Sequence, residues 1–280
     1  MKSVFKSPAL REKILTRYNQ ILDGFPFEKL RLETRAGETF ALAAGKVENP
    51  ALILLHGSCS NSAFWFPELT ALSRWYRVYA FDIPGEAGNS ADNRLDLHGE
   101  AYADWLMDAL RALGIERASV AGNSLGGWMA LRFAAKYPAC VLRLALIAPG
   151  GLSGVNEAVF ERARRAEAEG ATLSVDASVS GGATLPPPVL EFMNLIFSGF
   201  NPIAEALPIF SDDALKRLTM PALLVGGTED DMLDMQTAAK RAEALIPCAR
   251  VLLLEGVGHI ITNAVDYLIP FLVDGGLKAP

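Results

Sequence analysis

The sequence predicts an α/β fold in which a mostly parallel sheet is covered by helices on both faces. Short, continuously apolar runs suit strands that are buried on both sides. These runs alternate along the chain with stretches of helical periodicity, which is the pattern of a parallel sheet. The chain has 280 residues, of which 51% are hydrophobic and 21% charged, so a large core can form within one domain.

The first half of the chain supplies the clearest elements. Residues 8–23 carry apolar side chains at helical spacing, with Ser7-Pro8 as a start signal and Gly24 as a stop. Segments 27–33 and 38–43 alternate weakly and predict an antiparallel hairpin. The elements that we expect next are strands 51–55, 77–81, 118–121 and 142–147 and helices 63–74, 99–113 and 125–136.

The pattern changes between residues 155 and 218. Two helical stretches, 156–169 and 188–198, flank Ser/Gly/Pro-rich chain, and Pro186-Pro187-Pro188 cannot be internal to a helix or a central strand. The α/β pattern then resumes with strands 221–225 and 250–254 and helices 233–246 and 262–273. We therefore expect a single domain, 1–280, with a core of 1–154 and 219–280 and a lid inserted at 155–218.

Charge and cysteine content exclude several classes of function. The net charge is −6 at pH 7, which gives no electrostatic reason to bind nucleic acid or an anionic membrane. The three cysteines lie far apart without a C-x-x-C pair, so neither a disulfide framework nor a cysteine-based zinc site is expected. Residues 1–17 lack an apolar signal-peptide region and no apolar run approaches a membrane span, so we expect a cytoplasmic protein.

Gly122, Ser124 and Gly126 have G-x-S-x-G spacing between a predicted strand and a predicted helix. A serine on such a sharp turn projects its hydroxyl from the fold, with a helix N-terminus beneath it. The flanking glycines have a physical reason, because a Cβ on either side would crowd the turn. The alternative is an ordinary glycine-rich turn with a serine helix cap.

A serine nucleophile needs a base, and the sequence has three histidines. His98 falls near the start of a predicted surface helix, and His56 ends a buried strand, where it can brace the following loop. His259 follows the last strand, so it shares the carboxyl edge of the sheet with Ser124. We expect His259 to be the base; the alternative is a histidine in a surface loop.

The orienting acid and the oxyanion donors should come from other strand ends. Glu229, Asp230 and Asp231 follow a buried strand; we favour Asp230, then Asp231, then Glu229, and the alternative is a solvated acidic loop. The oxyanion donors should be backbone N–H groups. We expect those of Leu125, after the nucleophile, and Ser58, with the N–H of Cys59 as the alternative to Ser58.

Together these motifs resemble the α/β-hydrolase superfamily. The matching stretches are His56-Gly57, Asp82-Ile-Pro-Gly85-Glu-Ala-Gly88-Asn-Ser90, Gly122-Asn-Ser-Leu-Gly126-Gly127, Gly227-Thr-Glu-Asp230 and Gly256-Val-Gly-His259, each in the expected strand order. The resemblance implies the α/β-hydrolase fold with an eight-stranded, mostly parallel sheet, a Ser-Asp-His triad, no cofactor or metal, and a lid over the site.

Within the superfamily, the N-terminal helix and the stretches after His56 and Asp82 resemble bacterial carboxylesterase-like hydrolases. This implies a small-molecule, mainly apolar ester as substrate. In the expected lid, Phe192 and Phe197 can line an apolar pocket or, alternatively, pack the lid onto the body; Cys59 and Ile260 are the other candidate substrate contacts. The 122–127 and 148–152 stretches also resemble carbon–carbon hydrolases of ring-fission products. Those enzymes usually carry Trp after the catalytic histidine, where this chain has Ile260. A non-catalytic ligand-binding protein on the same fold is the alternative of another class, and the sequence gives no oligomeric state.

Overall fold

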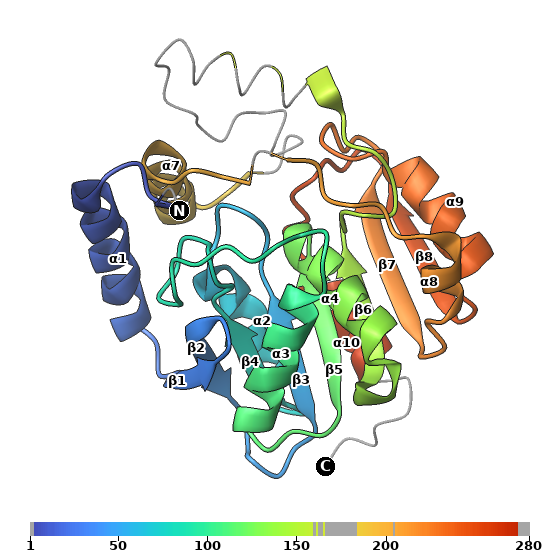
Figure 1. Ribbon diagram of the computed structural model, residues 1–280, viewed down its shortest axis with the longest axis horizontal. Coiled ribbons are helices and arrows are strands. Elements are labelled where there is room, and N and C mark those ends of the chain that lie inside the picture. Colours follow the sequence, from blue (N-terminus) through green and yellow to red (C-terminus); the bar gives the residue numbers. More distant parts are fainter. Residues whose placement is uncertain (1–2, 159–160, 162–164, 166–183, 204, 274–280) are drawn as a thin grey trace.

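The computed structural model describes residues 3–158, 161, 165, 184–203 and 205–273. One eight-stranded sheet forms its centre, in the order β1-β2-β4-β3-β5-β6-β7-β8 (Figure 1). The β1–β2 and β2–β4 pairs are antiparallel and the other pairs are parallel. The strands are β1 Glu28–Thr34, β2 Gly37–Ala44, β3 Ala51–Leu55, β4 Arg77–Phe81, β5 Ala118–Asn123, β6 Val141–Ile147, β7 Ala222–Gly227 and β8 Ala249–Leu254.

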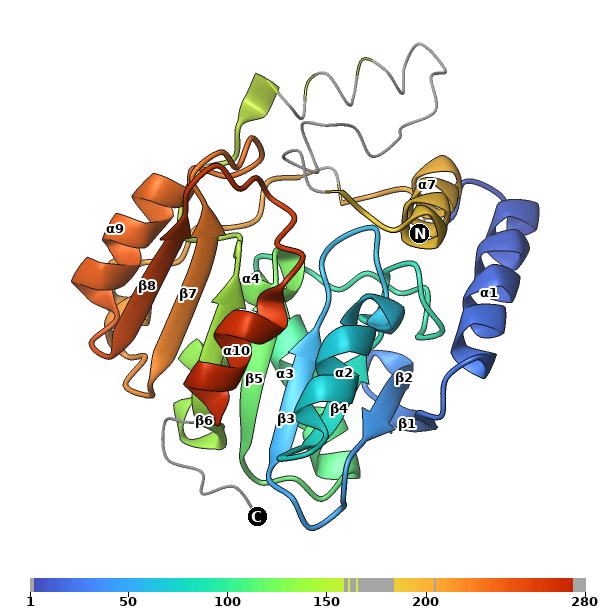
Figure 2. The ribbon, with the colours of Figure 1, turned by 180° about the vertical axis from the view of Figure 1, so that it is seen from behind.

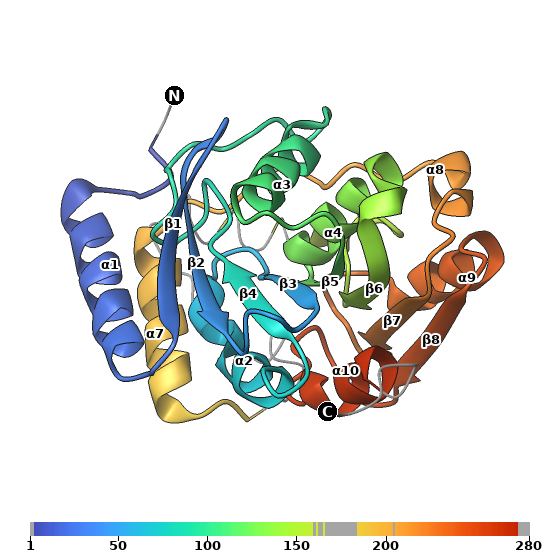
Figure 3. The same ribbon diagram turned by 90° about the horizontal axis from the view of Figure 1, so that it is seen from below.

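Helices cover both faces of this sheet, which confirms the predicted α/β architecture. One face carries α3, α4 and α9 over one apolar cluster, and the other carries α2 and α10 over a second (Figures 2 and 3). Helix α1 lies beyond the β1 edge (Figure 3) and contributes Ile14, Tyr18 and Leu22 to the second cluster. The helices are α1 Pro8–Asp23, α2 Phe66–Leu72, α3 Ala101–Ala112, α4 Leu125–Lys136, α7 Pro187–Gly199, α8 Asp212–Lys216, α9 Met235–Leu245 and α10 Ala264–Leu272. Within the described ranges, no helix is long and apolar enough to cross a membrane.

The N-terminal helix begins and ends where the sequence predicts. The Ser7 hydroxyl accepts the Leu10 N–H, Pro8 occupies the first turn, and Gly24 follows the last residue. Ile14, Tyr18 and Leu22 are the buried residues of α1. This face packs α1 against α7, a neighbour far away in the sequence (Figure 1).

Two local predictions were incomplete. The helix expected at 63–74 is a 3₁₀ turn, Ser62–Trp65, followed by α2, and the short helix α8 was not anticipated. The break has a cause, because Pro67 occupies the first turn of α2 and cannot donate a backbone hydrogen bond. Most of the helix predicted at 156–169 lies outside the described residues.

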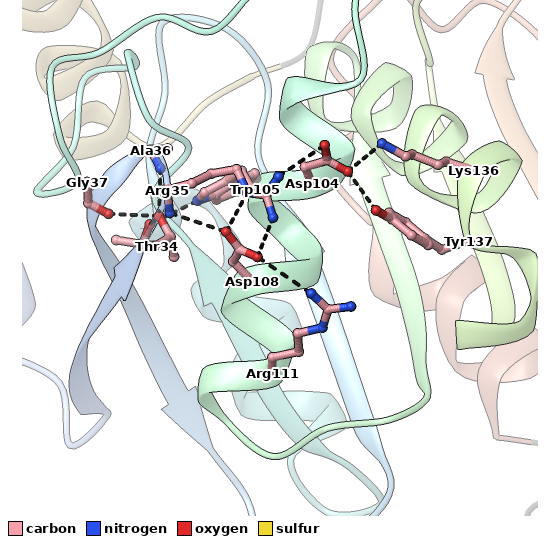
Figure 4. A network of polar contacts seen from close by, with 11 residues as sticks. Thr34, Arg35, Ala36, Gly37, Asp104, Trp105, Asp108, Arg111, Lys136 and Tyr137 are labelled. Atoms are coloured by element: carbon pink, nitrogen blue, oxygen red, sulfur yellow. Dashed lines mark hydrogen bonds and ion pairs between the residues drawn. The ribbon is translucent and has the colours of Figure 1, made fainter.

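An ionic network joins the β1–β2 turn to two helices (Figure 4). Arg35 contacts Asp104 and Asp108 on α3, and Asp104 also accepts from Lys136 and Tyr137 at the end of α4. The hydrogen bond from Lys136 lowers the pKa of Asp104, and that from Arg35 lowers the pKa of Asp108. These partly exposed pairs join the edge of the sheet to α3 and α4.

Candidate functional site

Ser124 stands on a strained turn between β5 and α4. Its backbone has φ 51° and ψ −111°, a region that a non-glycine residue seldom adopts. A Cβ on Gly122 would lie 2.2 Å from the Gly126 carbonyl oxygen, and one on Gly126 would lie 2.1 Å from the Leu55 carbonyl oxygen. The two glycines therefore allow α4 to approach β5 and β3 closely enough to hold the serine at the sheet edge.

His259 and Asp230 reach Ser124 from the loops after β8 and β7. His259 Nε2 lies 3.0 Å from Ser124 Oγ, and His259 Nδ1 lies 2.8 Å from Asp230 Oδ2. Asp230 Oδ1 accepts the Met232 and Leu233 N–H groups at 2.9 and 3.0 Å, which leaves Oδ2 facing the imidazole. The structure thus brings the three predicted side chains into one hydrogen-bonded chain.

The other two acids of this loop point away from that chain. Glu229 and Asp231 are exposed, whereas the side chain of Asp230 is 1% exposed. The loops after β7 and β8 also approach closely, since a Cβ on Gly227 would lie 2.0 Å from the Val257 carbonyl oxygen. This contact sets the position of Asp230 relative to the loop that carries His259.

The loop after β3 is braced by His56. The Ile83 N–H donates to His56 Nε2 at 3.0 Å, so the ring proton resides on Nδ1, which donates to the Gly57 carbonyl at 2.7 Å. Burial lowers the pKa of His56, so the ring stays neutral. Because the C=O and N–H of a trans peptide point in opposite directions, this bond directs the Ser58 N–H away from the His56 ring.

The same loop lies against the nucleophile turn. A Cβ on Gly57 would lie 2.9 Å from Asn123 Oδ1 and 3.5 Å from Ser124 Cβ. Leu125 is the first residue of α4, and the first N–H groups of a helix have no partner within the helix. The Ser58 and Leu125 N–H groups are therefore the two predicted donors on loops that meet at Ser124.

Cys59, the alternative donor, has its N–H engaged elsewhere. That N–H donates to Glu86 Oε2 at 2.8 Å. The Cys59 side chain is buried, which raises the pKa of its thiol to about 12 and keeps it protonated. Cys59 therefore lies beside the site as a neutral thiol.

The remaining predicted contacts occupy different surroundings. Phe192 on α7 stacks against Tyr18 at 6.1 Å and against Phe64 at 6.0 Å between ring centroids. Phe197 is partly buried on the same helix, and Ile260 directly follows His259 and is also partly buried. Of these, Ile260 is adjacent to the triad, and Phe192 packs α7 onto α1 and the loop after β3.

Sequence reasoning missed a buried polar network around Asp82. Asp82 Oδ1 accepts from the Tyr18 hydroxyl at 2.9 Å and the Ser62 N–H at 2.8 Å, and Oδ2 accepts the Asn89 N–H at 2.7 Å. Asp82 directly follows the buried strand β4. This position in the sequence indicates that Asp82 lies at the same edge of the sheet as the site. Nothing in the local sequence indicates that a tyrosine of the N-terminal helix is its partner.

Comparisons with known proteins agree with this geometry. The alpha/beta hydrolase family model matches residues 52–266. The carboxylesterase YbfK of Bacillus subtilis (strain 168) is 30% identical over 278 residues, covering 93% of each chain. The crystal structure of carboxylesterase CesB (YbfK) from Bacillus subtilis superposes with a TM-score of 0.81 at 28% identity, covering 96% of this chain and 100% of that one.

A second solved structure has the same architecture. The naproxen esterase (carboxylesterase NP) of Bacillus subtilis has a TM-score of 0.76 at 26% identity, over 90% of this chain and 93% of its own. The family match extends from β3 to α10 and includes the Ser124, Asp230 and His259 loops. The chain belongs to the alpha/beta hydrolase family.

Proposed function

We propose that this protein is a serine hydrolase that cleaves carboxylic esters of small, mainly apolar substrates through an acyl-enzyme intermediate. The observation that carries the proposal is the hydrogen-bonded chain from Ser124 Oγ to His259 at 3.0 Å and from His259 to Asp230 at 2.8 Å. The full-length similarity to proteins named as carboxylesterases supports the substrate class. These relatives favour ester cleavage over carbon–carbon cleavage, for which Ile260 after His259 also gives no support.

The proposed mechanism assigns one role to each group. His259 takes the Ser124 proton as Oγ attacks the acyl carbon, and Asp230 holds the imidazole in the tautomer that can accept it. The Leu125 and Ser58 N–H groups donate to the oxyanion of the tetrahedral intermediate. His259 then donates its proton to the leaving alcohol and activates the water that releases the acid.

The segment of residues 155–218, which lies between β6 and β7, is proposed to be the lid that sets substrate choice. Its helix α7 carries Phe192 and Phe197, and Phe192 fixes the helix to α1 and to the loop after β3. The proposed place of action is the cytoplasm. The substrate is a small molecule, with no role for nucleic acid or membrane.

Replacing the nucleophile tests the proposal. Ser124→Ala should lower kcat for p-nitrophenyl butyrate by roughly 10⁴- to 10⁶-fold, because the acyl-enzyme cannot form. The thermal midpoint should stay close to that of the wild type. Ser73→Ala is the matched control and should keep full activity, since Ser73 is a partly exposed residue after α2 whose hydroxyl donates to the Thr70 carbonyl.

A fluorophosphonate probe separates an enzyme from a non-catalytic binder. The probe should label wild-type protein and the Ser73→Ala control, with the modified peptide containing Ser124. Wild-type turnover by Ser124→Ala, or labelling at another residue, would disprove the assignment.

A further inference from the structure

Four hydrogen bonds join the loop after β3 to the loop after β4. In two of them, the Ile83 N–H donates to His56 and the Ser62 N–H donates to Asp82. The other two run from Asn61 Nδ2 to the Ala87 carbonyl at 2.9 Å and from the Cys59 N–H to Glu86 Oε2 at 2.8 Å. The loop that carries Ser58 is therefore held along its length by residues 82–87.

The bond to Glu86 acts at the strained point of this loop. Cys59 has φ 53°, a left-handed conformation that is unfavourable for a residue other than glycine. Such a conformation persists only where the surroundings hold it. The Cys59 N–H belongs to the peptide after Ser58, so its hydrogen bond fixes one side of Ser58, while the bond from His56 to the Gly57 carbonyl fixes the other.

Glu86 is an unusual residue for this position. It is 2% exposed, and its Oε1 has no hydrogen-bond partner among the described residues. Burial raises the pKa of Glu86 to about 8, against the opposing effects of Arg94, the Cys59 N–H and the Ser58 hydroxyl. At pH 7 the carboxyl is therefore mostly neutral and still accepts the Cys59 N–H.

Few charged or titratable groups face this carboxyl. The Arg94 guanidinium lies on the same loop and donates to the Gly85, Asn201 and Pro202 carbonyls. Glu86 contributes to the raised pKa values of Cys59 and of Tyr102 on α3, each about 12, so both stay protonated. Ionisation of Glu86 therefore places a negative charge, only partly offset by Arg94, beside the donor loop.

We propose that Glu86 is a positioning residue for ester cleavage: through the Cys59 N–H it holds the Ser58 N–H in the direction of the developing oxyanion. The inference rests on the proposed function, since it requires Ser58 to donate to that oxyanion. A neutral carboxyl suits this role, because it holds the loop without repelling the negative charge of the tetrahedral intermediate.

The test compares Glu86→Gln, which keeps a neutral acceptor, with Glu86→Leu, which has a similar size and no acceptor. With p-nitrophenyl butyrate at pH 7, Glu86→Leu should lose about 10- to 100-fold in kcat with KM within about 3-fold, because the donor acts in the transition state. Glu86→Gln should retain kcat within about 3-fold. Asp92→Asn removes an exposed carboxylate from the same loop and should match the wild type.

The pH profile distinguishes positioning from a merely structural role. Wild-type kcat should decline as pH rises through about 8, where Glu86 ionises, and Glu86→Gln should lack this decline. The comparison of the wild-type and Glu86→Gln pH profiles remains decisive if Glu86→Leu fails to fold. An unchanged kcat in Glu86→Leu, or the same alkaline decline in Glu86→Gln, would overturn the inference. If either of these results is found while Ser124→Ala is inactive, the proposed function stands and only the role of Glu86 has been misassigned.

Discussion

At the scale of single residues, Asp230 divides its carboxylate between two tasks. One oxygen accepts two N–H groups of its own loop and the other faces His259. Asp230→Asn should keep this loop geometry while placing an amide against the imidazole. We expect kcat to fall by roughly 10³- to 10⁴-fold, because the wrong histidine tautomer is favoured. Steady-state hydrolysis of p-nitrophenyl butyrate measures this loss.

Asp231→Asn is the control, since Asp231 is exposed one position further along the chain. It should remain within about 2-fold of the wild type, as surface substitutions usually do. A greater loss in Asp231→Asn than in Asp230→Asn would reverse the assignment of the acid.

The sequence predicts the positions of Ser124, Asp230 and His259 because each follows a recognisable apolar strand, of which β5 and β7 are buried and β8 is partly exposed. Parallel strands end at one edge, so strand order alone brings these loops together. The partners of Glu86 and Asp82 could not be predicted in this way. They depend on contacts between two loops and between one loop and α1, which leave no periodic or spacing signal in the chain.

At the scale of elements, Tyr18 anchors α1 to the core. Its ring is fully buried, and its hydroxyl lies 2.9 Å from Asp82 Oδ1 and 2.7 Å from Ser62 Oγ. Tyr18→Phe removes a donor to a buried carboxylate, which should lower the free energy of unfolding by about 1–3 kcal/mol. Urea unfolding at pH 7 measures the change.

Tyr267→Phe provides the comparison for this loss. Tyr267 is a partly buried residue of α10, and the described contacts give its hydroxyl no hydrogen bond. Its substitution should change stability by less than about 0.5 kcal/mol. Equal effects of the two substitutions would contradict the anchoring role of the Tyr18 hydroxyl.

Element boundaries were predictable where a local signal marks them. The ends of α1 carry capping residues, the buried strand β3 is a continuous apolar run, and the buried strand β4 is apolar after Arg77. The 3₁₀ turn before α2 and the five-residue α8 were missed because helical periodicity needs more residues than either contains. Packing and hydrogen bonding decide such short elements.

At the scale of the whole molecule, two buried carboxyls set the pH dependence of stability. Burial raises the pKa of Glu68 to about 7 and that of Glu86 to about 8. The folded protein then holds protons that the unfolded chain releases, so stability falls as pH rises. The buried His56 has a lowered pKa and opposes this trend only as pH falls below its ordinary value of 6.5.

Between pH 6.5 and 8, we therefore expect the free energy of unfolding to decrease by about 1–3 kcal/mol, since one proton per carboxyl corresponds to about 1.4 kcal/mol per pH unit. The double substitution Glu68→Gln and Glu86→Gln should flatten the dependence. Urea unfolding at several pH values in this window measures it. Stability that rises across the window would contradict the neutral state of these carboxyls.

The stacked rings of Tyr18, Phe192 and Phe64 have a consequence for chimeric enzymes. Helix α7 rests on α1 through these rings, although more than half of the chain separates the two helices. A graft of residues 155–218 from a relative, made to change substrate preference, would place foreign side chains on the native Tyr18. The exchangeable module is therefore discontinuous: it comprises the inserted segment together with the first helix, and both should be transplanted as a pair.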